Sequence, residues 1–129
     1  MPVVEICDTR LGEWRQLGIE QIVADNSFAG GFVRGTAHAD WRDLELAEHE
    51  VSLSADGALL GRGPGRLVMG HPLDGLAWLA SNLAARGHGL KPGDLVAAGT
   101  CTGLHLLRPP SRVLADFGLL GTVRFEVAA

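Results

Sequence analysis

The sequence predicts a mainly β domain of the α+β class, built from short strands and one main helix. Eighteen glycines are spread over 129 residues, which is typical of a fold with many turns. Short runs of alternating apolar and polar residues recur between them, whereas one segment carries a clear helical period. Because the order is strands, then a helix, then strands, the sequence does not predict a parallel Rossmann sheet.

Length, charge and cysteine content limit the class of protein. A chain of 129 residues fits one core, so we expect residues 1–129 to form a single domain. The net charge is −4 and the basic residues form no stripe, which argues against a nucleic-acid partner. No apolar run reaches the roughly 18 residues that cross a membrane. Cys7 and Cys101 lack zinc-site spacing, so we expect free thiols in a reducing cytoplasm.

The first part of the chain predicts two strands around a mixed segment. Residues 2–7 are apolar or β-branched except for Glu5, and residues 30–35 form a short apolar run bounded by glycines. The segment between them has no clear period, but we expect its apolar side chains to be buried. These side chains are Trp14, Leu17, Ile19, Ile22 and Val23.

The middle of the chain predicts a hairpin, a loop and the main helix. Residues 51–54 alternate, Asp56-Gly57 supplies a turn, and residues 58–60 resume the apolar pattern. Residues 61–65 contain three glycines and a proline, so we expect a loop there. The helix is expected over residues 73–86, where leucines and alanines form one apolar face, with Pro72 suited to its first turn and Gly87 to the position after its end.

Three further strands are expected near the carboxyl end. Residues 91–94 predict a turn that leads into an apolar strand over residues 95–99. Residues 113–117 and 122–127 predict two more strands, joined by a turn over residues 118–121.

Five motifs, in a fixed order, carry a resemblance to one family. They are residues 4–10 with Glu13-Trp14, residues 23–26, residues 70–73 with 77–80, residues 90–96 with Gly99-Thr100, and residues 115–117 with 120–123. Each is short, but together they extend over nearly the whole chain. In this order they resemble the 2-keto-4-pentenoate hydratase and 4-oxalocrotonate decarboxylase group of the fumarylacetoacetate hydrolase superfamily.

The resemblance implies a mixed β-roll and a lyase that acts on a small 2-oxo or 2-hydroxydienoic acid. It also implies a divalent metal, usually Mg²⁺ or Mn²⁺, that holds the acid and stabilises its enolate. In the family the ligands are a Glu-x-Glu pair and a later glutamate, which corresponds to Glu5. The Glu-x-Glu pair and a catalytic lysine lie upstream of the matching motif. We therefore expect a truncated β-roll without the family's amino-terminal half, and weak or absent metal binding.

Glu5 is the candidate metal ligand, since the resemblance places it in the ligand motif. A carboxylate in an otherwise apolar strand needs a metal or a charged partner if it is buried. The alternative is therefore an ion pair with an arginine such as Arg10.

Two polar clusters are candidates for the substrate pocket. The resemblance makes Asp25 and Ser27 candidate catalytic residues and Asn26 a substrate contact, although such residues also favour plain turns. In the family a small residue and then a serine follow the Ala-Asp-Asn motif, whereas Ser27 and Phe28 follow here, so the serine has moved by one place or been lost to phenylalanine. Thr100 and Cys101 are candidate substrate contacts in a loop whose N–H groups could hold a carboxylate, or they form a plain turn.

Three functions are compatible with these features. The first is the family's lyase activity, with the missing ligands supplied by a partner chain. The second is metal-independent cyclisation or condensation in a biosynthetic pathway by a shortened relative. The third is a non-catalytic subunit. Because half of a β-roll leaves strand edges unpaired, we expect a homo-oligomer in addition to the small acid substrate.

Overall fold

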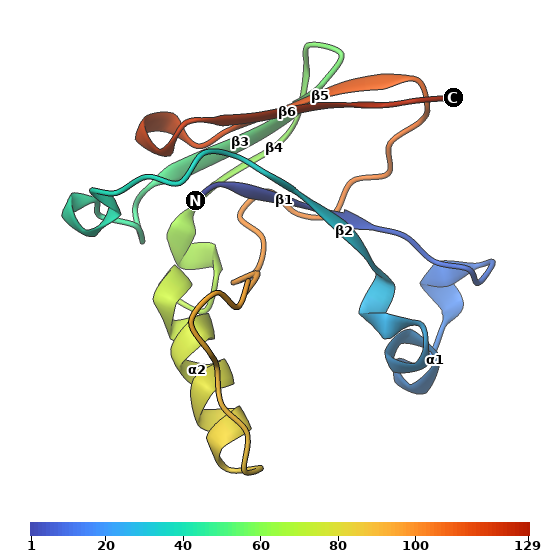
Figure 1. The fold of residues 1–129 in the computed structure, drawn as a ribbon. Helices are drawn as coiled ribbons and strands as arrows, with labels where there is room; N and C mark the ends of the chain where they lie inside the picture. Colours follow the sequence, from blue (N-terminus) through green and yellow to red (C-terminus); the bar gives the residue numbers. More distant parts are fainter.

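Two antiparallel sheets and one long helix make up the fold (Figure 1). The computed structural model describes all residues from 1 to 129. The smaller sheet pairs β1 with β2, and the larger has the order β4-β3-β5-β6. The mainly β prediction with one main helix is confirmed, and every strand pairing is antiparallel. The elements are β1 (Val3–Cys7), α1 (Ile19–Ala24), β2 (Ala29–Arg34), β3 (Glu50–Ala55), β4 (Ala58–Pro64), α2 (Pro72–Ala84), β5 (Ser111–Asp116) and β6 (Thr122–Val127), with five short 3₁₀ turns.

The smaller sheet contacts β6 of the larger sheet at the end where Pro2 and Gly35 lie. The N–H of Gly35 donates to the carbonyl of Pro2 at 2.9 Å, which continues the β1–β2 ladder past its last paired residues. Pro2 is fully buried there, and Gly35 lies against the side chain of Val123 in β6. At the other end the ladder shifts register at Gly30, where a side chain would meet the carbonyl of Ile6. Such bulges bend a strand pair and are frequent beside functional sites.

The β3–β4 hairpin forms around Asp56-Gly57 as predicted, but the loop expected over residues 61–65 is largely wrong. β4 continues to Pro64, and its glycines have a packing role rather than a turning one. A Cβ atom on Gly63 would lie 2.5 Å from the carbonyl oxygen of Cys101, and one on Gly61 would meet the carbonyl of Thr102. These glycines therefore let a distant backbone segment lie directly against β4.

Helix α2 confirms the helix prediction within two residues at each end. The N–H of Leu73 donates to Nδ1 of His71 at 3.1 Å, which caps the first turn. At the other end Gly87 has a φ of +75°, and the N–H of His88 donates to the carbonyl of Leu83 at 2.9 Å. This is the hydrogen bond of a glycine-terminated helix. No residue of α2 is buried, and the helix extends away from both sheets (Figure 1).

Two expectations about apolar segments are wrong. Residues 95–99 form no strand, because no neighbouring strand pairs with them. Ile19 and Val23 are exposed at 67% and 64%, since α1 buries no residue against another element. Trp14, Leu17 and Ile22 are half-buried.

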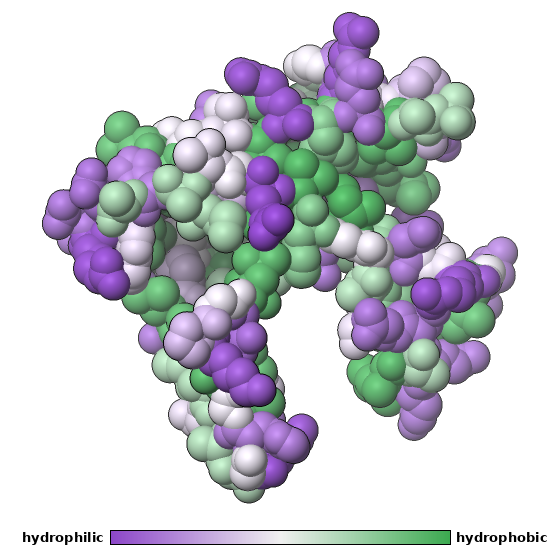
Figure 2. All heavy atoms as spheres, in the orientation of Figure 1, coloured by the Kyte–Doolittle hydropathy of each residue, from purple (hydrophilic) through white to green (hydrophobic).

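The core is small and lies on one face of the larger sheet. Ten of 129 residues are buried, among them Val51, Val113, Ala115 and Val123 from β3, β5 and β6. The accessible surface is 8975 Å², whereas a compact monomer of 13.6 kDa exposes about 6,600 Å². Figure 2 shows apolar residues on the two arms that carry α1 and α2. None of the helices combines the length and apolar character needed to cross a membrane.

The contact at Gly63 generates a stability prediction. Gly63→Ala forces a methyl group against the carbonyl of Cys101, so we expect a loss of about 1–3 kcal/mol in the free energy of unfolding. Gly31→Ala in β2 is the matched control because nothing lies within 4 Å of its added Cβ atom. Urea unfolding of both variants measures the difference. Equal stabilities would contradict the close backbone packing.

Candidate active site

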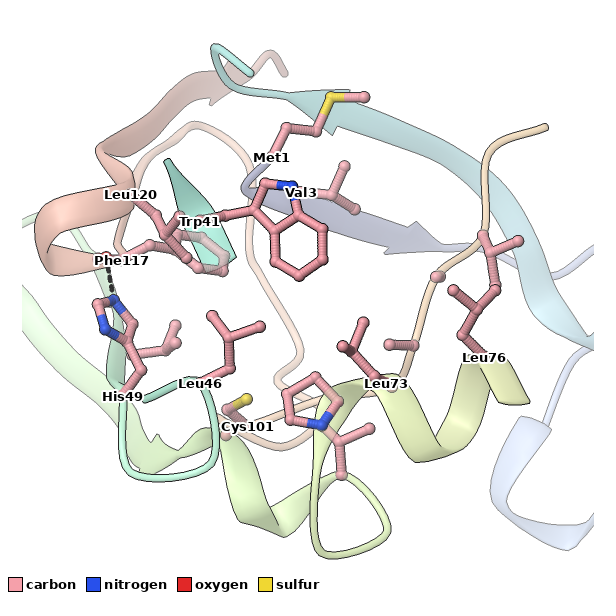
Figure 3. A pocket seen from close by; sticks show the side chains of 18 of the residues that line it. Met1, Val3, Trp41, Leu46, His49, Leu73, Leu76, Cys101, Phe117 and Leu120 are labelled. Carbon is pink, nitrogen blue, oxygen red and sulfur yellow. Dashed lines mark hydrogen bonds between the residues drawn. The ribbon is translucent and has the colours of Figure 1, made fainter. Parts of the chain in front are cut away.

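A cavity lies between β1, the start of α2 and the extended segment over residues 96–101. It has a volume of about 360 Å³, and 14 of its 19 lining residues are hydrophobic. In Figure 3 Met1, Val3 and Trp41 face the cavity from one side, and Leu73 and Cys101 face it from the other. A cavity of this size with mostly apolar walls and few polar groups is typical of a site for a small organic ligand.

Glu5 is the only acidic side chain in the wall of this cavity. It follows Val3 at the two-residue spacing that places side chains on one face of a strand. The residue is exposed and makes no ion pair or side-chain hydrogen bond. The alternative pairing with Arg10 is wrong, because the Arg10 guanidinium binds Asp25. The Glu5 carboxylate is therefore free to meet a ligand.

The residues of this chain do not form a metal centre by themselves. No group of three or more His, Cys, Asp and Glu side chains lies close enough to hold an ion. Mg²⁺ prefers oxygen ligands in octahedral geometry, commonly from one or two carboxylates plus waters and substrate. Glu5 supplies one such ligand. His49 and Cys101 also line the cavity, but they offer nitrogen and sulfur rather than oxygen ligands.

His49 holds one end of the cavity together and was not predicted. Its Nε2 lies 2.5 Å from the carbonyl oxygen of Phe117, to which it donates (Figure 3). The bond joins the residue before β3 to the turn after β5, 68 positions later in the chain. Trp41, from a 3₁₀ turn, is another unpredicted member of the wall. No local sequence signal marks either residue, because both act through long-range contacts.

Cys101 lies in the cavity wall, whereas Thr100 does not. Burial, and secondarily the charge of Glu50, raises the pKa of the Cys101 thiol. The thiol is therefore protonated at neutral pH, which suits a wall residue better than a nucleophile. The Thr100 hydroxyl accepts the N–H groups of Thr102 and Gly103 at 3.2 and 3.0 Å, so it stabilises the turn that brings Cys101 to β4.

Asp25 is a buried anchor for the loop that follows β1. Its side chain is 6% exposed, and it accepts hydrogen bonds from the Thr9 hydroxyl at 2.5 Å and the Arg10 guanidinium at 2.6 Å. The Thr9 hydrogen bond, and then those from Arg10, hold the pKa of this carboxyl below its usual range. Asn26 and Ser27 follow with positive φ angles of 54° each. The structure thus brings Glu5 and Cys101 to one cavity but leaves Asp25, Asn26, Ser27 and Thr100 outside its wall.

Comparison with known proteins assigns the chain to a family. The family model described as fumarylacetoacetate (FAA) hydrolase C-terminal matches residues 3–128. The chain belongs to the fumarylacetoacetate hydrolase family. The resemblance found in the sequence motifs is thereby confirmed, and the matched region is almost the whole chain.

Members of this family with related sequences are hydratases and decarboxylases. A 2-hydroxyhexa-2,4-dienoate hydratase of Comamonas testosteroni is 39% identical over 77% of this chain and 37% of its own length. A 2-keto-4-pentenoate hydratase of Paraburkholderia phymatum is 32% identical over 96% of this chain and 47% of its own. The chain therefore spans about half the length of the curated relatives it matches.

A solved structure of the family has the same fold. The 4-oxalocrotonate decarboxylase from Pseudomonas putida G7, complexed with magnesium and adipate, superposes with a TM-score of 0.87 at 29% identity. The superposition covers 95% of this chain and 46% of the decarboxylase. The fold predicted from the resemblance is therefore confirmed for the described residues.

The anchor at Asp25 generates a prediction about pH. Because the folded pKa of Asp25 is lowered, its stabilisation is present above the unfolded pKa, near 4, and is lost as pH falls through the folded pKa. We expect Asp25→Asn to lower the melting temperature at pH 7 and the difference from wild type to shrink below about pH 4.

Glu126→Gln is the matched control for this experiment. It removes a carboxylate from an ion pair with Arg112 in which both side chains are exposed, so it should leave stability nearly unchanged. A difference between Asp25→Asn and wild type that stays constant from pH 7 to pH 3 would contradict the ionised anchor.

Proposed function

We propose that this chain provides one wall of the active site of a lyase that hydrates or decarboxylates a small 2-oxo or 2-hydroxydienoic acid. One observation carries the proposal: the only carboxylate in the apolar cavity, Glu5, is also the residue that the sequence resemblance assigns to the ligand motif. The related hydratases and decarboxylases support the reaction class. The decarboxylase complex with adipate supports an organic acid as the ligand.

The proposed chemistry divides the cavity into an acidic side and an apolar side. The apolar walls, including Val3, Trp41 and Leu73, would enclose the reacting carbons of the acid and exclude water around them. Glu5 would act at the polar head of the substrate, and Cys101 would contact the chain from the opposite wall. Asp25 and Ser27 as catalytic residues, and Asn26 and Thr100 as substrate contacts, stay predictions. The contacts of Asp25 support a positioning role for it, through the loop that follows β1.

A Mg²⁺ or Mn²⁺ site would need more than this chain provides. Glu5 gives one oxygen ligand, so the remaining ligands would come from a partner chain, from substrate and from water. A partner chain would also cover exposed surface, because the fold exposes roughly 2,400 Å² more than a compact monomer of its mass. We therefore propose a homo-oligomer in which a second chain covers part of this surface.

The assembly proposal is tested by sedimentation. Stable interfaces bury about 800 Å² on each partner, which the excess surface of this chain can supply. We expect the protein to sediment as a dimer or larger species at micromolar concentrations. A single species with the mass of one chain over that range would contradict the proposal.

Metal-independent cyclisation or condensation is the second candidate function. The observation that favours it is the absence of any cluster of three metal-binding side chains in the chain. A non-catalytic subunit is a further alternative under the same observation. Activity on 2-oxo acids in the presence of a chelator separates these functions from the first.

The decisive variant is Glu5→Gln, assayed with and without a chelator. If the first function holds, Glu5→Gln and chelation each lower turnover by roughly 100-fold or more, as when a group that stabilises developing charge is lost. Glu126→Gln removes a carboxylate far from the cavity wall and is the matched control. Full turnover in both treatments would contradict a metal-assisted lyase and favour the second function. No turnover by wild type with any acid would favour the non-catalytic subunit.

A further inference from the structure

A second cavity, of about 260 Å³, follows the first along the same two chain segments. Val3 and Glu5 of β1 line the first cavity, and Cys7 of the same strand lines the second. The opposite walls come from residues 96–101 and then from residues 104–106. Because a strand rises about 3.3 Å per residue, Glu5 and Cys7 lie about 7 Å apart along β1. An acid that binds in the first cavity beside Glu5 could therefore extend its tail past Cys7 into the second cavity.

The second cavity has an aromatic wall. Trp14 and Phe28 pack edge to face, with ring centroids 6.5 Å apart and planes at 84°. Leu104 and Leu106 also line the cavity, and both are exposed, at 62% and 69%. Aromatic rings in this arrangement offer a face and an edge to a flat apolar group. Asp8, Thr9, Arg15 and His105 complete the lining, so the ring pair and the two leucines are the part that suits an unsaturated or aromatic tail.

Several contacts hold Trp14 in place. The Arg15 guanidinium lies 4.4 Å from the centre of the Trp14 ring and stacks on it. Asp25 binds Thr9 and Arg10, which fixes the loop that connects β1 to Trp14. The buried anchor described above thus supports one side of the second cavity.

Phe28 is held in an unusual backbone conformation. Its φ is +62°, and it follows Asn26 and Ser27 at +54°, so three consecutive non-glycine residues have left-handed φ angles. Such angles are costly for residues with side chains and persist where surrounding contacts impose them. Here the Phe28 N–H donates to the carbonyl of Asp25 at 3.1 Å, and its carbonyl accepts from Asp8 at 2.9 Å. The turn places Phe28, and not Ser27, in the wall of the cavity.

We propose that Trp14 and Phe28 form a subsite for the apolar tail of the acid substrate and that Phe28 sets the preference for that tail. The inference rests on the proposed function, because it takes the acid head to bind in the first cavity beside Glu5. Where the resemblance implies a serine, moved to Ser27 or lost to Phe28, this chain presents the ring of Phe28 to the cavity. It should therefore favour acids with longer or aromatic tails over short ones.

The test is calorimetric binding, in the presence of Mg²⁺, of a series of straight-chain 2-oxo acids of increasing length, together with phenylpyruvate. For wild type we expect affinity to rise about threefold to fourfold per added methylene once the tail reaches the subsite. In Phe28→Ser this rise should be lost, while the affinity for the shortest acid changes less than about twofold. Trp78→Ala removes an aromatic residue that lines neither cavity and should behave as wild type. The same length dependence in Phe28→Ser and wild type would overturn the proposal.

A second variant guards against misfolding of Phe28→Ser. Trp14→Leu leaves the strained turn intact, and it should flatten the length dependence in the same way. Because binding is measured without turnover, the outcome is separate from that of the lyase assay. Length-dependent binding without turnover would leave the subsite standing and remove the lyase function. Turnover with affinity independent of tail length, or no binding of any acid, would overturn the subsite.

Discussion

The close contact between β4 and the segment over residues 99–105 is the constraint on which the candidate site depends. Gly61 and Gly63 have no side chains, so the carbonyls of Thr102 and Cys101 can lie directly against the strand. This contact carries the extended segment across the larger sheet and places Cys101 in the cavity that Glu5 also lines. With ten buried residues in the chain, few other contacts could fix that geometry. The cavity is therefore built by backbone packing more than by a hydrophobic core.

Both the packing of the fold and the candidate site lack groups that a partner chain could provide. The fold exposes far more surface than a compact monomer of its mass, and helix α2 extends from the sheets with no buried residue. The candidate site likewise holds a single carboxylate where a magnesium site needs several oxygen ligands. A partner that covers the exposed faces could supply ligands at the same time. The proposed assembly and the proposed lyase activity are thus linked through one surface.

Local signals in the sequence predicted local structure well. The hairpin was predicted from the alternation over residues 51–60 around Asp56-Gly57. The helix was predicted from its apolar face, with Pro72 at its start and Gly87 after its end. Both predictions succeeded because these elements depend on residues that are neighbours in the chain. Gly61 and Gly63 predicted a loop, but they instead allow contact with Thr102 and Cys101, which lie 41 and 38 positions later in the chain. His49 bound to Phe117, and Asp25 bound to Arg10, have no local signature for the same reason. The resemblance identified Glu5 and Cys101, which lie in the cavity wall, but sequence could not show that Asp25 points into an ion pair outside it.

The central claim is that an organic acid binds between Glu5 of β1 and the segment that β4 holds in place. The most direct measurement is a crystal structure of the protein with Mg²⁺ and adipate, the two ligands seen together in the related decarboxylase. We expect adipate in the cavity, with one carboxylate held beside Glu5 through Mg²⁺ and its carbons against the wall formed by Val3 and Cys101. Adipate bound elsewhere, with that cavity empty, would contradict it.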